Sequence, residues 1–201
     1  MEEYYLRVMT AIVPESVDAI LKIVDENLFR GCKRIHLMLS TPGGSVAQGI
    51  SLTNYLIGVP IELYTYNFGA IDSIGVSVYC AGIRRFCSPQ SRFLIHRISL
   101  ALIENQSIDE EFIFRKLREI EVDTNNVAAI ISRASGMNME KVVSAMKRQT
   151  ILDAQGAIDC GIAHQMQSFL MPAGVPFSTI SPNFSINNYS QNDSMILQTP
   201  S

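Results

Sequence analysis

The sequence predicts an α/β fold built on a largely parallel sheet. Short apolar runs of strand length alternate with segments whose apolar residues recur at helical spacing, and turn residues separate the two. Of the 201 residues, 47% are hydrophobic and 17% are charged, which supplies the core of one domain of ordinary size. This composition excludes a wholly disordered chain.

The first half of the chain alternates strands with helices. A strand covers residues 4–9, and the helix that follows begins at Pro14 and ends at Gly31. The next elements are a buried strand at Ile35–Leu39, a helix at Ser45–Leu56, a strand at Ile61–Tyr66 and a helix of small residues at Ser73–Ala81.

The second half begins with two short strands, around Arg85–Cys87 and Phe93–His96. A long amphipathic helix is expected at Ile108–Ser135, since its apolar residues lie on one stripe. Two shorter helices follow, at Met139–Arg148 and Ala154–Ile162.

The last thirty residues differ in composition from the rest. Residues 172–201 contain one charged residue, Asp193, and are rich in Ser, Thr, Asn, Gln and Pro. We therefore expect a domain at residues 1–171 and a flexible polar tail at residues 172–201. Two short apolar patches in this tail, Phe177–Ile180 and Met195–Leu197, could dock on a neighbour.

Charge and cysteine content exclude several classes of function. The formal net charge is −3, so no basic surface for nucleic acid is expected. The sequence has no apolar run of about 20 residues and no secretory signal, so no membrane association is expected. Four widely spaced cysteines lack metal-ligand spacing and are read as reduced thiols of a cytoplasmic protein, or of an organelle stroma in a photosynthetic eukaryote: Cys32, Cys80, Cys87 and Cys160. We expect no metal and no other cofactor.

A turn that contains Pro42, Gly43 and Gly44 is the first candidate for chemistry. Proline fixes one backbone angle, and the two glycines permit positive φ and a close approach of the backbone to a ligand. The turn lies between a buried strand and a helix, at the sheet edge where α/β proteins bind ligands. A plain strand–helix turn would contain the same residues.

Ser73 and His96 are the second and third candidates. Ser73 follows a strand and a loop and would lie at the first turn of a helix, where free N–H groups stabilise an oxyanion. A helix N-cap is the alternative role of this serine. His96 ends an apolar strand and could face a cleft as a general base, although a lone histidine is often structural.

These three features occur in order, and together they resemble the ClpP-type serine peptidases, the Clp protease proteolytic subunit family. The matching segments are Leu39–Val46, Gly69–Ala81 and Arg85–His96, and the last of them is the most specific. The resemblance extends from about Leu6 to Ile162.

The resemblance implies a fold, a site and an assembly. The fold is the crotonase-like αβ spiral (the ClpP fold) with a projecting handle helix, for which Ile108–Ser135 lies in the right place. Ser73 takes the position of the nucleophile and His96 that of the general base, while Gly44 and Ile74 take the positions of the backbone oxyanion hole. In this family the handle helices interdigitate between two rings, which implies a homo-oligomer or a mixed ring with paralogues.

The sequence departs from the family at three places. Gln149 aligns with the aspartate that completes the family's triad, and Asp153 lies four residues later as a possible substitute. Asp72 precedes the serine, where the family has a small apolar residue. The first strand begins almost at Met1, which argues against docking to a hexameric Clp-type ATPase, although such a partner stays possible.

The leading hypothesis is a serine endopeptidase that acts on peptides or unfolded proteins. A catalytically inactive ring subunit is the alternative, motivated by Gln149 and Asp72. The third hypothesis is an acyl-CoA enzyme, since the crotonase fold also serves that chemistry.

Overall fold

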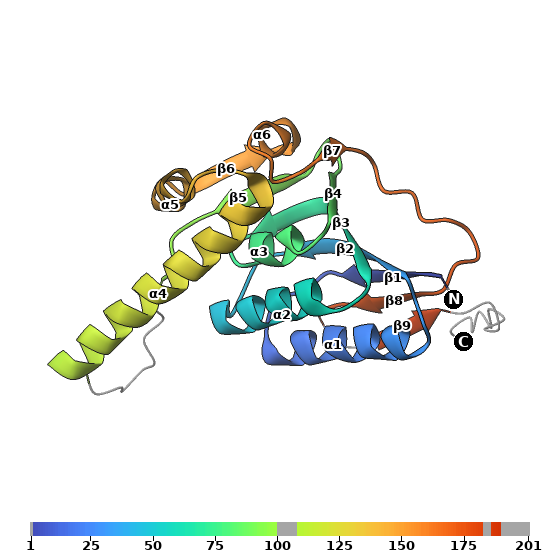
Figure 1. Cartoon of the computed structure of the whole chain (residues 1–201), viewed down its shortest axis with the longest axis horizontal. Helices are drawn as coiled ribbons and strands as arrows, with labels where there is room; N and C mark the ends of the chain where they lie inside the picture. Colours follow the sequence, from blue (N-terminus) through green and yellow to red (C-terminus); the bar gives the residue numbers. More distant parts are fainter. Residues whose placement is uncertain (1, 100–107, 183–185, 190–201) are drawn as a thin grey trace, which may run out of the picture.

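A twisted sheet forms the centre of the molecule in the computed structural model, which describes residues 2–99, 108–182 and 186–189 (Figure 1). The strands are β1 (Glu3–Val8), β2 (Arg34–Thr41), β3 (Glu62–Asp72), β4 (Arg84–Cys87), β5 (Arg92–Ile95), β6 (Thr150–Asp153), β7 (Gln165–Met166), β8 (Phe177–Ile180) and β9 (Ile186–Tyr189). The helices are α1 (Pro14–Phe29), α2 (Val46–Gly58), α3 (Gly75–Cys80), α4 (Glu110–Ser135), α5 (Met139–Lys147) and α6 (Ala154–Asp159).

The sheet is parallel at its centre and antiparallel at its two ends. The main path of strands runs β6-β5-β3-β2-β1-β8-β9, and β4 pairs with β3 and β7 beside this path. The β5–β6 and β8–β9 pairs are antiparallel, while the pairs between them are parallel. The predicted α/β class with a largely parallel sheet is therefore confirmed. Parallel strands are buried on both faces, which explains why β1 and β2 read as continuous apolar runs.

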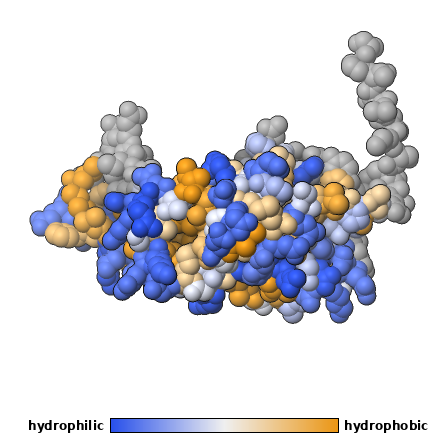
Figure 2. Space-filling model, turned by 90° about the horizontal axis from the view of Figure 1, so that it is seen from above, coloured by the Kyte–Doolittle hydropathy of each residue, from blue (hydrophilic) through white to orange (hydrophobic). Residues whose placement is uncertain are grey.

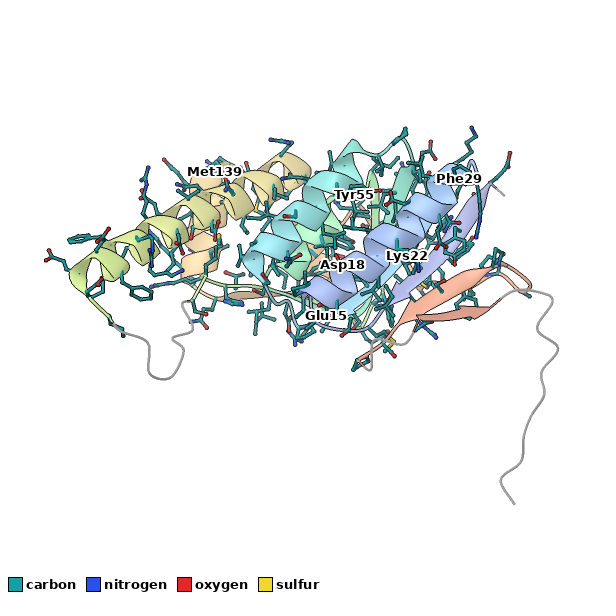
Figure 3. The ribbon with its side chains drawn as sticks, turned by 90° about the horizontal axis from the view of Figure 1, so that it is seen from below. Glu15, Asp18, Lys22, Phe29, Tyr55 and Met139 are labelled. Carbon is teal, nitrogen blue, oxygen red and sulfur yellow. The ribbon has the colours of Figure 1, made fainter. Side chains whose placement is uncertain are left out.

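Helices α1, α2 and α3 cover one face of this sheet (Figure 1). The apolar side chains between these helices and the strands form the main core, with Leu6, Leu37, Leu52 and Tyr79 almost completely buried. Helices α1 and α2 lie side by side (Figure 3), and the Tyr55 hydroxyl of α2 donates to Asp25 of α1. Burial and this carboxylate raise the pKa of Tyr55 to about 12.

Helix α4 projects from the body of the molecule, as the predicted handle does (Figure 1). The Asp109 side chain caps its first turn by accepting from the Phe112 N–H at 2.7 Å, and Gly136, with φ of 78°, ends the helix. The carboxyl-terminal half packs on the body through buried residues, while the projecting half exposes apolar side chains, including Phe114 and Leu117. Figure 2 shows hydrophobic surface at this projecting end.

A cluster of aromatic side chains lies on the other face of the sheet. Tyr5 and Tyr66 are buried there, and the segment at residues 169–177 packs against them. His36 stacks on Tyr5 with ring centroids 4.4 Å apart, and its Nδ1 lies 2.9 Å from the Tyr66 hydroxyl. Burial lowers the pKa of His36. This histidine is therefore part of the packing of the sheet.

Part of the predicted flexible tail is a strand of the sheet. Strand β8 pairs in parallel with β1, and Ser178 and Ile180 are fully buried. The Tyr4 and Ser178 hydroxyls are 2.5 Å apart. The prediction is wrong for Phe177–Ile180 because these β-favouring residues cover the edge of β1, a long-range pairing that composition cannot reveal. The patch Met195–Leu197 lies outside the described residues.

Candidate active site

Ser73 occupies a tight elbow between strand β3 and helix α3. Its φ is 58°, in the left-handed region that non-glycine residues rarely adopt. Such a conformation costs about 1–3 kcal/mol and is kept only where the surrounding structure holds it. The Ser73 N–H donates to the Leu94 carbonyl at 2.8 Å, which ties the elbow to β5. The N-cap position of α3 belongs to Ile74, so the alternative reading of Ser73 as a helix cap is wrong.

The turn at Gly43 and Gly44 packs directly against this elbow. A Cβ atom on Gly43 would lie 2.6 Å from the Cβ of Ser73, and one on Gly44 would lie 2.3 Å from the Ile12 carbonyl oxygen. Both glycines also have positive φ, 88° and 153°. The Ile12 N–H donates to the Gly43 carbonyl, and the Ser45 N–H donates to the Ile12 carbonyl, each at 2.8 Å. Only glycine fits at these two positions.

Two backbone N–H groups beside Ser73 have no partner. Within the part of the chain that the structure describes, neither the Gly44 N–H nor the Ile74 N–H makes a hydrogen bond. One group comes from the glycine turn and the other from the residue after Ser73. Unpaired N–H groups next to a hydroxyl are the type of donor that stabilises a developing oxyanion.

His96 comes directly after strand β5 and is half-buried. Its Nδ1 lies 2.6 Å from the Arg97 carbonyl oxygen. A carbonyl only accepts hydrogen bonds, so Nδ1 carries the proton and the neutral ring has its free lone pair on Nε2. This tautomer suits a general base.

Ser73 and His96 line the same small pocket, with a volume of about 10 Å³. Its apolar wall includes Val127 and Ile131 of α4 and Met146 of α5. Among the described residues, no hydrogen bond joins the Ser73 hydroxyl to the His96 ring. The fold thus brings together the four residues selected from the sequence, Ser73, His96, Gly44 and Ile74, without a direct Ser73–His96 bond.

The register of strands β5 and β6 places the two candidate third partners. Ile95 pairs with Thr150 in the last step of this ladder, and the next residues beyond that pair are His96 and Gln149. Asp153 pairs with Arg92, four residues away, which is about 13 Å along a strand. The Asp153 carboxylate also caps helix α6 by accepting from the Gly156 N–H at 2.8 Å. Asp153 therefore lies away from His96.

The Asp72 carboxylate, which precedes Ser73, is bound by Arg92. The Nη1 and Nη2 atoms of Arg92 donate to the two carboxylate oxygens at 2.7 and 2.9 Å. The pair lines an open cleft of about 620 Å³ at the carboxyl ends of β1, β2 and β3, together with Met9, Ser40 and Pro42. Sequence reasoning missed Arg92, because its contact with Asp72 depends on the pairing of β3 with β5.

No cluster of His, Cys, Asp and Glu side chains within residues 2–99, 108–182 and 186–189 could hold a metal ion. In the same ranges, no helix combines the length and the apolar character needed to cross a bilayer. The four cysteines are free thiols, as predicted.

Comparison with known proteins assigns the family of this chain and finds similar proteins. The sequence model of the Clp protease family matches residues 14–168, so the chain belongs to this family. The chain is 30% identical over 132 residues to ATP-dependent Clp protease proteolytic subunit 2 of Treponema pallidum (strain Nichols), which is 65% of this chain and 64% of that relative. The match thus spans less than two thirds of the relative's length.

A solved structure supports the same fold. A mutant of ClpP1 from Listeria monocytogenes superposes with a TM-score of 0.74 and 19% sequence identity, over 82% of this chain and 91% of that one. At this identity the comparison shows the fold alone. The predicted ClpP fold with a projecting handle helix is therefore confirmed.

Proposed function

We propose that this chain is a serine endopeptidase that hydrolyses peptide bonds inside an oligomeric ring. The observation that carries the proposal is the left-handed elbow at Ser73, beside the unpaired N–H groups of Gly44 and Ile74. A strained serine next to two free donors meets the needs of acyl transfer, because the nucleophile is accessible and the oxyanion has hydrogen-bond donors.

The mechanism begins with attack of the Ser73 hydroxyl on the carbonyl carbon of the scissile peptide bond. His96 accepts the hydroxyl proton on Nε2, and the N–H groups of Gly44 and Ile74 bind the carbonyl oxygen as it becomes an oxyanion. The C–N bond then breaks, and His96 gives its proton to the leaving amine. Water next attacks the acyl-enzyme with His96 as base, which releases the acid and restores the Ser73 hydroxyl.

His96 would work here without a negatively charged partner. Its Nδ1–H donates to the Arg97 carbonyl, which fixes the tautomer and the ring orientation. A neutral carbonyl stabilises an imidazolium less than a carboxylate does. We therefore expect a slow peptidase, whose rate is limited by formation of charged His96.

Labelling with a fluorophosphonate probe tests this proposal. The assembled protein is incubated with the probe beside the variants Ser73→Ala and His96→Ala, and mass spectrometry identifies the modified residue. We expect labelling at Ser73 that is lost in Ser73→Ala and strongly slowed in His96→Ala. Absence of labelling in folded, assembled protein would contradict the proposal.

A catalytically inactive ring subunit is the second candidate. The observation that favours it is the neutral Gln149, which with His96 lies next beyond the last pair of the β5–β6 ladder. This alternative requires an active paralogue in the same ring, so it predicts co-purification with a labelled partner while this chain stays unlabelled. Neither the family match nor the structural comparison supports the acyl-CoA enzyme considered from the sequence.

The proposed assembly uses the projecting helix α4. Clp family proteins form oligomeric rings and degrade peptides, and exposed apolar side chains on α4, such as Phe114 and Leu117, need cover from another subunit. We propose a homo-oligomer or a mixed ring with paralogues, with a peptide or an unfolded protein as the substrate. The name of the Treponema relative states that its protease is ATP-dependent, and we extend this to a Clp-type ATPase as a partner of this chain.

A further inference from the structure

We propose that the Asp72–Arg92 ion pair is a positioning device that aligns Ser73 with His96. The inference rests on the serine peptidase function proposed above and adds two residues to that site. Neither residue takes part in bond making. Their role is to hold the elbow that carries the nucleophile in register with the strand that leads to the base.

The geometry of the pair is that of a rigid clamp. Arg92 donates two parallel hydrogen bonds, at 2.7 and 2.9 Å, and each goes to a different oxygen of Asp72. This two-point contact fixes orientation as well as distance, which a single contact does not. The Asp72 side chain is only 14% exposed, while that of Arg92 is 46% exposed. The Asp72 carboxylate thus lies on the more buried side of the pair, and both of its oxygens accept from Arg92.

The position of the pair along the chain links it to both reacting residues. Asp72 is bonded covalently to Ser73, and Arg92 begins strand β5, four residues before His96. The Ser73 N–H also donates to the Leu94 carbonyl of that strand at 2.8 Å. Three hydrogen bonds therefore connect the elbow to β5. Movement of one element would carry the other with it.

Strand β3 also holds the Arg92 end of the clamp. The Asn67 side-chain amide donates to the Arg92 carbonyl at 2.8 Å, so the backbone of Arg92 is fixed from the strand that carries Asp72. Asp153 lies opposite Arg92 on the other side, but its carboxylate caps α6. No ion pair joins Asp153 to Arg92 among the described residues. Arg92 therefore pairs with Asp72, which precedes Ser73, and not with Asp153.

This site has a particular need for such a clamp. The Ser73 conformation is strained, and no described hydrogen bond holds its hydroxyl to His96. Gln149 stands where an acid would orient the histidine in the family's triad. A misplacement of about 1 Å can cost about 100-fold in rate, so alignment must come from the backbone and its supports.

The test combines kinetics on two single variants and one double variant. Asp72→Asn keeps the size of the side chain and Arg92→Gln replaces the guanidinium with a shorter neutral amide, so each variant removes one charge of the pair. We expect each to slow labelling of Ser73 by fluorophosphonate and kcat for a peptide about tenfold, with KM unchanged. The double variant should be no slower than the worse single one, since both changes break one clamp.

A matched ion pair in the same sheet provides the control. Arg34 and Glu62 face each other across β2 and β3 at the amino ends of the strands, with donor–acceptor distances of 2.6 and 2.9 Å. Glu62→Gln should leave the labelling rate unchanged. A rise in KM at constant kcat for Asp72→Asn or Arg92→Gln would assign the pair to substrate binding and overturn the proposal. Singles whose effects multiply in the double variant would also overturn it.

Hydrogen exchange separates failure of this inference from failure of the proposed function. Exchange of peptides that cover residues 69–76 is followed by mass spectrometry on the same variants, and needs no catalysis. We expect faster exchange in Asp72→Asn and Arg92→Gln than in the wild type, and no change in Glu62→Gln. Faster exchange in a protein that is never labelled would reject the peptidase but keep the clamp. Unchanged exchange with normal labelling would reject the clamp alone.

Discussion

Gln149 lies next to Thr150, whose pairing with Ile95 ends the β5–β6 ladder one residue before His96. Its backbone is left-handed, with φ of 53°, and its side chain is exposed. The histidine instead donates its Nδ1–H to the Arg97 carbonyl. His96 is therefore oriented by a backbone carbonyl. Gln149, at the end of the neighbouring strand, carries no charge.

Gln149→Asp tests whether this missing charge limits the rate. A carboxylate at this position would stabilise the imidazolium that forms in each step, so we expect labelling of Ser73 and peptide hydrolysis to rise by about tenfold or more. Gln149→Asn is the control of equal size, and both residues tolerate left-handed backbone. Equal rates for the Asp and Asn variants would show that charge at this position is without effect.

Gly43→Ala tests the close approach of the glycine turn to the elbow. The new Cβ would lie 2.6 Å from the Ser73 Cβ at a φ of 88°, so either the turn or the elbow must move. We expect a loss of more than about 2 kcal/mol in the free energy of unfolding, and loss of labelling. Denaturant titration at one protein concentration measures the first quantity.

Gly31→Ala is the matched control for that variant. Gly31 has a φ of 73°, but nothing lies within 4 Å of the position of a new Cβ. This variant isolates the backbone cost, which we expect to be about 1 kcal/mol, and should label normally. If Gly31→Ala and Gly43→Ala lose the same free energy of unfolding and their Ser73 is labelled equally, the packing of the turn on Ser73 does not contribute to stability or to reactivity.

His36 makes folding sensitive to acid. Its pKa in the folded state lies below the ordinary 6.5, mainly because of burial, although Glu3 acts in the opposite direction. The unfolded chain therefore binds a proton at a pH where the folded chain does not. The contribution of the neutral His36 ring to stability is therefore fully present above about pH 6.5. This contribution is lost as the pH falls below that value. We expect the free energy of unfolding to fall across this range, measured by denaturant titration.

His36→Gln removes the titrating group while it retains hydrogen-bonding capacity. The slope of stability against pH should become flatter, whatever happens to stability at neutral pH. Burial and Arg85 also lower the pKa of His164, so His164→Gln measures the second contribution separately. An unchanged slope in His36→Gln would mean that this ring does not control the response.

We predict that assembly depends on helix α4, because this helix exposes apolar side chains. Phe114 is 63% exposed and Leu117 is 58% exposed. We expect Phe114→Glu or Leu117→Glu to lower the sedimentation coefficient of the assembled protein without unfolding the subunit. Phe29→Glu at the end of α1 changes a side chain that is 93% exposed and serves as the control. Assembly that survives both α4 variants would exclude the projecting half of α4 from the interface.

The sequence predicts most of this fold because local pattern and tertiary structure agree along the chain. The helix from Pro14 and the strand at Ile35–Leu39 were predicted close to their observed bounds. Strand β6 was missed, since its four residues show no pattern of their own between two helices. Strand β8 was missed because polar composition predicted flexibility, and only its pairing with β1 makes it a strand.

The same limit applies to the candidate site. The residue types at Ser73 and His96 identify a possible nucleophile and base, and Gly43 and Gly44 mark a turn with unusual backbone angles. Which acidic side chain lies near which basic side chain depends on strand register. The sequence does not show that register. The pairing of Asp72 with Arg92 and the distance of Asp153 from His96 both follow from register. Resemblance to a family could locate Gln149, but only the structure identifies the Arg97 carbonyl as the partner of His96.

The pairing of β8 with β1 has a consequence for how the protein is made. A ribosome delivers the chain from its amino end, so β1 leaves it well before Ile180 does. Until then one border of the sheet exposes a row of backbone donors and acceptors that can recruit strands of other nascent chains. Translation products that stop before Phe177 would keep this border open and would be prone to aggregation. Completion of the sheet thus distinguishes finished copies from abortive ones.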